Sequence, residues 1–145
     1  MIEVRYPQAN VTIYMVREWK EAGSFVGPPK SPVVITAPVN GKPTQLDITQ
    51  DMRQACESIL PPMVESMLDL LSRVQPEYQE KVRNNIVLSG GTGLIRGLGP
   101  RLEQELQVVG GGKVRVVKDP VYVGSDGGLA ISLDAPDSDW EMLSA

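Results

Sequence analysis

The spacing of apolar and polar residues along the chain predicts an α/β fold in which helices predominate, with a β-hairpin and a small mixed sheet. Apolar positions three or four residues apart predict helices over about 10–22, 49–71, 75–83, 100–106 and 129–133. Short β-branched or alternating runs predict strands over 33–39, 44–48, 86–88 and 113–118. We therefore expect an α/β domain with few strands.

Proline and glycine residues set the ends of these elements. The adjacent Pro61 and Pro62 fall inside the longest helical stretch, so a break or kink is expected there. Asn40-Gly41 between two strand-like runs predicts a tight hairpin. Pro38 and Pro43 beside it remove ladder donors, which suggests an exposed edge. Such an edge is either a contact surface for another chain or a loop without that role.

The C-terminal region carries a further glycine-rich segment. Gly124 to Gly128 precede the helix predicted over 129–133, and we expect these small residues to let it pack tightly against a sheet. Residues 136–145 form an acidic tail with an apolar edge around Trp140. This tail either docks as a short amphipathic turn or stays mobile.

The stretch from Asn85 to Leu106 combines a predicted strand, a glycine turn (Ser89-Gly90-Gly91-Thr92-Gly93) and a helix. Pro100 near the start of the helix and three glycines after its end are the expected asymmetry of helix termini. Many α/β proteins use this arrangement to present backbone N–H groups to an anionic or nucleotide ligand. The alternative is that the glycines only form a tight connection, and the motif alone does not decide between the two.

Composition narrows the function classes. The 145 residues suit one domain, 41% of them are hydrophobic, and the net charge is −4 with no run of basic residues longer than two. This balance argues against nucleic-acid binding. Without histidine and with Cys56 alone, the chain excludes ordinary zinc sites, His-dependent triads and an internal disulfide. No apolar run approaches membrane-spanning length, so we expect a soluble cytoplasmic protein without direct membrane insertion.

Two segments carry a resemblance to a known family. Residues 87–106, VLSGGTGLIRGLGPRLEQEL, resemble the adenosine-binding strand, turn and helix of the actin family, and residues 15–21, MVREWKE, resemble the family helix whose Lys-Glu pair faces the nucleoside. Within the family, the chain is most similar to the bacterial actins of magnetosome chains, through YPQANVT at 6–12, ACESILPPMVE at 55–65 and the closing WEML at 140–143. Rod-shape actins share the plan but not these details.

The resemblance implies a partial domain, corresponding to roughly the last two-fifths of a complete actin-like ATPase of the actin/Hsp70 superfold. It implies that about 1–24 and 85–145 belong to subdomain IIA and about 25–84 to subdomain IIB. The implied nucleotide-contacting residues are Gly90, Gly91 and Thr92 on the α-phosphate side, Leu94 and Ile95 against the base, and Arg17, Lys20 and Glu21 toward adenine and ribose. Lys118 lies near another family position, through a looser correspondence.

The implied function is that of a cytoskeletal filament protein organising a magnetosome chain. ATP or ADP with Mg would be the cofactor of the complete protein, and partners would be further copies, a full-length filament or magnetosome-associated proteins. The two Asp-x-Gly-x-Gly-Thr phosphate loops that the family needs are not in this sequence, so we expect this chain alone to bind nucleotide weakly or not at all and to be inactive in hydrolysis. Alternatives are a stand-alone module that caps or copolymerises with a full-length filament, and an enzyme of the same superfold.

Overall fold

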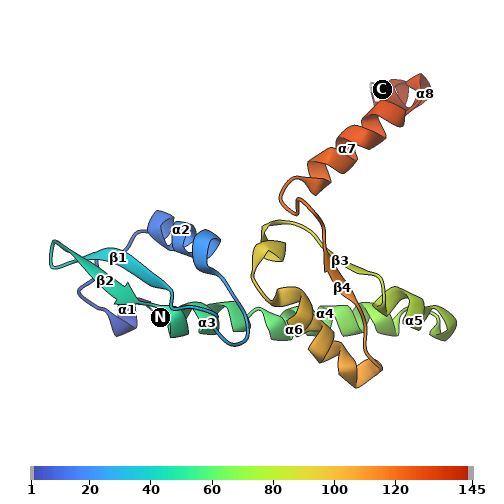
Figure 1. Ribbon diagram of the computed structural model, residues 1–145. Helices are drawn as coiled ribbons and strands as arrows, with labels where there is room; N and C mark the ends of the chain where they lie inside the picture. Colours follow the sequence, from blue (N-terminus) through green and yellow to red (C-terminus); the bar gives the residue numbers. More distant parts are fainter. Residues whose placement is uncertain (1, 144–145) are drawn as a thin grey trace.

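The computed structural model describes the backbone over residues 2–143 and the side chains over residues 4–140. The molecule is elongated and has two lobes (Figure 1). One lobe contains α1 (Ile2–Arg5), α2 (Ile13–Gly23), β1 (Val34–Val39), β2 (Lys42–Asp47) and α3 (Thr49–Glu57). The other contains α4 (Leu60–Ser72), α5 (Pro76–Arg83), β3 (Ile86–Leu88), α6 (Leu98–Glu105) and β4 (Val114–Val116).

The hairpin forms where the sequence predicts it. β1 and β2 pair antiparallel with Val39 opposite Lys42, and the two residues between them, Asn40 and Gly41, both have positive φ angles (50° and 76°). Positive φ at both turn positions matches the right-handed twist of the strands. Residues 8–10 lie alongside β1 near the turn, and the N–H of Asn10 donates to the carbonyl of Pro38 over 2.8 Å. That side of the hairpin is therefore covered by the N-terminal segment.

Helix α3 begins at Thr49, as predicted, and Asp47 fixes this start. Its carboxylate accepts hydrogen bonds from the hydroxyl and the backbone N–H of Thr49, over 2.6 and 2.9 Å. These hydrogen bonds lower the pKa of Asp47 below its ordinary value. The predicted break in the long helix is also present, because α3 ends at Glu57 and α4 starts at Leu60. Pro61 thereby falls in the first turn of α4, where a missing N–H costs no hydrogen bond.

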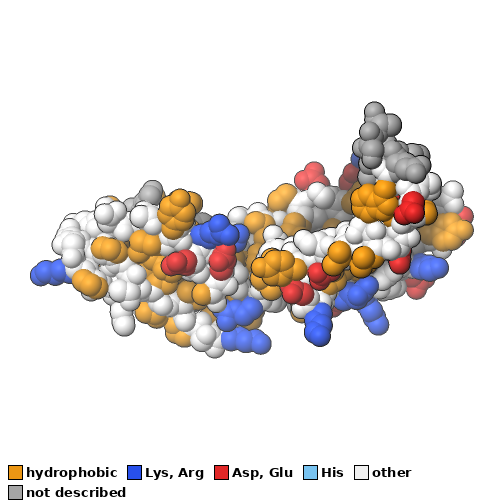
Figure 2. Space-filling model, turned by 90° about the horizontal axis from the view of Figure 1, so that it is seen from above, with side chains coloured by type: hydrophobic (Ala, Val, Ile, Leu, Met, Phe, Trp, Pro, Cys, Tyr) orange, Lys and Arg blue, Asp and Glu red, His pale blue; other side chains and the backbone are white. Residues whose placement is uncertain are grey.

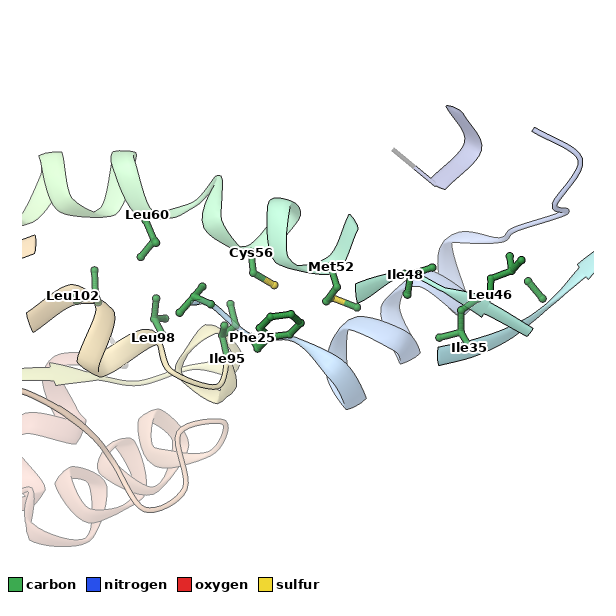
Figure 3. Packing of buried hydrophobic residues seen from close by; sticks show 12 residues of the cluster. Phe25, Ile35, Leu46, Ile48, Met52, Cys56, Leu60, Ile95, Leu98 and Leu102 are labelled. Atoms are coloured by element: carbon green, nitrogen blue, oxygen red, sulfur yellow. The ribbon is translucent and has the colours of Figure 1, made fainter. Parts of the chain in front are cut away.

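A single apolar core runs through both lobes. Met52 and Cys56 on α3 point toward Phe25 and Ile95, while the core continues past α4 to α6 (Figure 3). The buried cluster consists of Phe25, Val26, Ile35, Ala37, Leu46, Ile48, Met52, Cys56, Leu60, Ile95, Leu98 and Leu102. Burial of these side chains supplies the main driving force for the association of the lobes.

The predicted strand, turn and helix after Asn85 form a β–α–β unit. β3 and β4 pair in parallel, and α6 provides the crossover that a parallel pair needs. Leu102 and Leu106 are fully buried beneath this unit, and the carboxylate of Glu103 accepts a hydrogen bond from the N–H of Val114 over 2.8 Å. The described strands thus make a hairpin and a separate parallel pair, so the small sheet is parallel.

The C-terminal helices differ from expectation. α7 spans Val123–Asp134, so the glycine-rich segment is itself helical instead of preceding the helix. A Cβ atom at Gly124, Gly127 or Gly128 would meet nothing within 4 Å, and Figure 1 shows α7 extending away from the sheet. The predicted tight packing against a sheet is therefore wrong within the described residues. The acidic tail forms α8 (Asp137–Leu143), and its last residues, Ser144 and Ala145, lie outside the described residues.

The division into IIA-like and IIB-like parts stays a prediction. In space, α2 lies with the hairpin and α3 (Figure 1), and Gly23 at its end would bring an added Cβ to 3.0 Å from Val33. No helix among the described residues is long and apolar enough to cross a membrane.

Candidate functional site

Helix α2 provides the first part of the site. Thr12 caps it, because its hydroxyl accepts a hydrogen bond from the N–H of Met15 over 3.3 Å. Val16, Trp19 and Lys20 lie three or four residues apart and share one face, whereas Arg17 and Glu21 lie on the adjacent, exposed strip. The guanidinium of Arg17 donates to the carboxylate of Glu21 over 2.8 Å. This contact raises the pKa of Arg17 above its ordinary value.

The glycine turn provides the second part. Gly91 to Leu94 form a short 3₁₀ turn, which the N–H of Gly93 and the N–H of Ile95 stabilise by donating to the carbonyls of Gly90 and Thr92. Gly90 has a φ of 76°, a conformation that favours glycine. Gly93 is buried, and an added Cβ there would lie 3.4 Å from Pro120. The helix α6 starts only at Leu98, so its N-terminus is separated from the turn by Ile95, Arg96 and Gly97.

Arg96 joins these two parts. Its N–H donates to the carbonyl of Ser24 over 3.2 Å, and its carbonyl accepts from the N–H of Val26 over 2.9 Å, forming a parallel β-bridge. Its guanidinium also donates to the carbonyls of Gly23 and Ser24, over 3.1 and 3.3 Å. The C-terminal end of α2 is thereby attached to Arg96, the second residue after the glycine turn.

A cleft of about 490 Å³ opens between α2, α3 and the glycine turn. Of the predicted site residues, Lys20, Thr92 and Ile95 line it, so segments about seventy residues apart in sequence share one cavity. The walls are mainly apolar, from side chains such as Val16, Trp19, Met52 and Cys56, and Thr12 and Asp51 add polar groups. An apolar cleft with a few polar groups is typical of a small-molecule site, and this volume suits one.

The other predicted residues lie outside this lining. Arg17 and Glu21 form their ion pair on the neighbouring strip of α2, while Gly90, Gly91 and Leu94 belong to the turn without lining the cleft. Leu94 is 54% exposed. Lys118 follows the end of β4 and is not part of the lining either. The structure therefore brings together part of the predicted set, on adjoining surfaces of α2 and the turn.

Cys56 contributes bulk to the cleft wall. Burial raises the pKa of its thiol above the ordinary value, against the opposing effects of the backbone of Phe25 and the charge of Lys20. A thiol with a raised pKa is protonated at neutral pH and therefore weakly nucleophilic. Together with its place in the buried cluster, this makes Cys56 a packing residue.

The polar side chains that line the cleft are those of Thr12, Lys20, Asp51 and Thr92. Among the described residues, no group of three His, Cys, Asp or Glu side chains could hold a metal ion. The face seen in Figure 2 mixes acidic and basic side chains without a contiguous basic patch. The sequence did not identify Arg96 or α3 as parts of the site. Arg96 lies within the segment 87–106, but its partners Gly23 and Ser24 are more than seventy residues away, and α3 matches no local motif. The helical spacing that places Asp51, Met52 and Ala55 on nearby faces of α3 was the available signal.

Comparison with known proteins identifies the family. The MreB/Mbl protein family matches residues 30–137, which is most of the chain. The chain belongs to the MreB/Mbl family. It is 36% identical to the actin-like protein MamK of Paramagnetospirillum magneticum over 139 residues, which cover 96% of this chain and 40% of that protein. It is 35% identical over 139 residues to MamK of Magnetospirillum gryphiswaldense, covering 96% and 39%.

Solved MamK structures share the fold. The MamK double helical filament matches with a TM-score of 0.90 and 36% identity, covering 93% of this chain and 42% of that one. A non-polymerising MamK mutant bound to AMPPNP matches with a TM-score of 0.80 and 37% identity, covering 83% and 37%. The fold is thus a partial actin-like fold, and the chain spans about two fifths of the length of the relatives it matches.

Proposed function

We propose that this chain is the C-terminal part of a filament-forming, MamK-type bacterial actin and that it supplies the adenosine side of an ATP pocket. The observation that carries the proposal is the cleft in which Lys20, Thr92 and Ile95 meet. The AMPPNP bound to a MamK structure of the same fold supports it. In the complete protein, ATP or ADP with Mg would supply the phosphate chemistry.

Each part of the site suits a different part of a nucleoside. The carboxylate of Glu21 can accept hydrogen bonds from ribose hydroxyls, and its pairing with Arg17 holds it in place. Lys20 and the apolar side chain of Ile95 suit the edge and face of adenine. The backbone at Gly90, Gly91 and Thr92 allows close approach on the α-phosphate side, because glycines carry no side chain in the way.

The same proposal assigns polymerisation surfaces. We infer contacts between copies at the hairpin turn, Asn40-Gly41, and at the segment from Tyr122 to Gly128. Tyr122 is 62% exposed, and the hairpin turn lies at one end of the elongated molecule (Figure 1). The MamK double helical filament supports assembly by further copies or by a full-length relative, and magnetosome-associated proteins are the proposed further partners.

Calorimetry with ATP tests the nucleotide part of the proposal. Because the phosphate loops are not in this chain, ATP should bind to the 145 residues only weakly, with a dissociation constant far above the micromolar range, and no turnover should exceed that of buffer. Micromolar affinity or clear ATP hydrolysis by this chain would contradict the division of the pocket that we propose.

A second function, from another class, is a stand-alone module that caps or copolymerises with a full-length filament without nucleotide chemistry. The exposed apolar side chains of α7 favour it, since Ile131 and Leu133 are 73% and 76% exposed. Sedimentation of the chain with and without a full-length filament separates the two functions. Co-sedimentation that does not depend on nucleotide supports the module, and its absence argues against it.

A further inference from the structure

We propose that Arg96 is a positioning residue for the nucleotide site, because its side chain sets the position of α2 relative to the glycine turn. This inference rests on the proposed function and adds a residue that belongs neither to the predicted nucleotide-contacting residues nor to the cleft lining. Arg96 follows Ile95, which lines the cleft, and its guanidinium reaches back 72 and 73 residues to Ser24 and Gly23.

The contacts of Arg96 lead directly to the predicted adenosine residues. Arg96 binds the carbonyl of Ser24 through its side chain and its backbone N–H, and the N–H of Ser24 in turn donates to the carbonyl of Lys20 over 3.0 Å. In the other direction, the N–H of Ile95 donates to the carbonyl of Thr92 over 3.1 Å. Lys20 and Thr92, on opposite sides of the cleft, are therefore connected through Arg96. Two hydrogen bonds lie on the α2 side of Arg96 and one lies on the side of the glycine turn.

The guanidinium is suited to this role. The last carbonyl groups of a helix have no partner inside the helix, and a cation beside them also interacts favourably with the helix dipole. The fork of a guanidinium can donate to two carbonyl oxygens at once, which fixes direction as well as distance. The backbone bridge alone would hold residues 24–26 near Arg96, but the two side-chain hydrogen bonds fix the orientation of the helix end.

Gly97 shows how closely these segments approach. An added Cβ at Gly97 would lie 2.9 Å from the carbonyl oxygen of Val26, a distance that requires the backbone to move. The junction between residues 23–26 and 95–97 is thus packed tightly enough to transmit a small displacement of one segment to the other. A nucleoside that contacts α2 and the turn together is sensitive to such a displacement, because both sets of contacts must be made at once.

NMR titration of the isotope-labelled 145-residue chain with MgADP at millimolar concentrations tests the inference. In the wild-type chain, ADP should shift the amide resonances of Lys20 and Glu21 together with those of Gly91 and Thr92. The variant Arg96→Gln should weaken binding about three- to tenfold, the size expected from losing hydrogen bonds to a charged group at a partly exposed position. Its α2 resonances should lose their response, while the glycine turn still responds at higher ADP.

Two further variants distinguish positioning from general destabilisation. Arg96→Lys should recover part of the affinity, because an ammonium can still donate to the same carbonyls. Arg73→Gln, which removes an exposed arginine that pairs with Asp69 in the last turn of α4, should bind ADP like the wild type. Unchanged ADP affinity and α2 response in Arg96→Gln would overturn the inference. Equal losses in both segments, together with a lower melting temperature and no recovery in Arg96→Lys, would overturn it as well.

The failure of the proposed function gives a different result. If ADP shifts neither α2 nor the glycine turn in the wild-type chain, the adenosine site itself is absent and the role of Arg96 falls with it. If the wild type responds and Arg96→Gln responds equally, the adenosine site stands and only the positioning role is wrong.

Discussion

The two glycine-rich segments, at 90–99 and 124–128, look alike in sequence but have opposite structural roles. In the first, Gly90 and Gly97 have positive φ angles, and Gly93 and Gly99 are buried against neighbouring segments. In the second, the glycines have helical backbone, and a Cβ atom added to any of them would meet nothing within 4 Å. Backbone conformation and contacts within this chain therefore favour glycine in the first segment, whereas they do not in the second.

The first segment belongs to the candidate site, whereas the second belongs to a helix that extends away from the sheet. The segment at 90–99 is held by residues 23–26, by Pro120 and by the buried helix α6, so its conformation is determined by many neighbours. The helix α7 has no buried residue, and its apolar side chains Leu129, Ile131 and Leu133 are exposed. We therefore expect the first region to be rigid and the second to be independent of it.

The largest effect is expected at the core of α6. Leu102 is fully buried, so Leu102→Ala should lower the free energy of unfolding by about 3–4 kcal/mol through lost burial and a cavity. Leu133→Ala in α7 is the matched control, since Leu133 is 76% exposed, and should change it by less than about 0.5 kcal/mol. Chemical denaturation of both variants measures the difference, and losses of similar size would show that α7 is packed in solution.

The next largest effect is expected at Gly97. Gly97→Ala should lower the free energy of unfolding by about 2–3 kcal/mol, because alanine is strained at a φ of 82° and its Cβ would meet the carbonyl of Val26. Thermal and chemical denaturation measure the loss. A neutral Gly97→Ala variant would contradict the close junction between residues 23–26 and 95–97.

A glycine-to-alanine substitution in α7 should have the opposite effect on stability. Gly128→Ala places a better helix former in a helical position with open space around it, so it should stabilise α7 by up to about 1 kcal/mol. Circular dichroism and the amide exchange rates of residues 123–134 report this change. Destabilisation by Gly128→Ala would indicate that another surface lies close to this helix.

The smallest effect concerns pH. The pKa of Asp47 is lowered by its hydrogen bonds with Thr49, so this contribution to stability is complete above the unfolded pKa of about 4 and is lost as the pH falls through the lower, folded pKa. The start of α3 should therefore loosen in acid, which the amide resonance of Thr49 reports. In Asp47→Asn this acid transition of Thr49 should disappear, and an unchanged transition would assign it to another group.

The sequence predicted the parts of the fold that depend on local patterns. The hairpin at Asn40-Gly41, the start of α3 at Thr49 and the break before Pro61 all follow from turn and capping chemistry. The resemblance to actin-like proteins, through the glycine turn and the Lys20-Glu21 helix, is confirmed at the level of the family. The contacts of those residues with a nucleotide remain a proposal.

What the sequence did not predict depends on distant contacts. The attachment of Arg96 to Gly23 and Ser24 links segments more than seventy residues apart, and no local pattern identifies it. The glycines of α7 were expected to pack against a sheet because small residues usually mark close approach, but among the described residues no sheet lies beside them. The glycine-rich composition of this segment indicated that another surface could approach it closely, but it did not identify that surface.

The most direct test of the central claim is the NMR titration of the wild-type chain with MgADP. If α2 and the glycine turn form one adenosine site, the amide resonances of Lys20, Glu21, Gly91 and Thr92 should shift together along one binding curve with millimolar affinity. Those of α7 should not move. Shifts confined to one of the two segments, or located only outside both of them, would contradict a shared adenosine site.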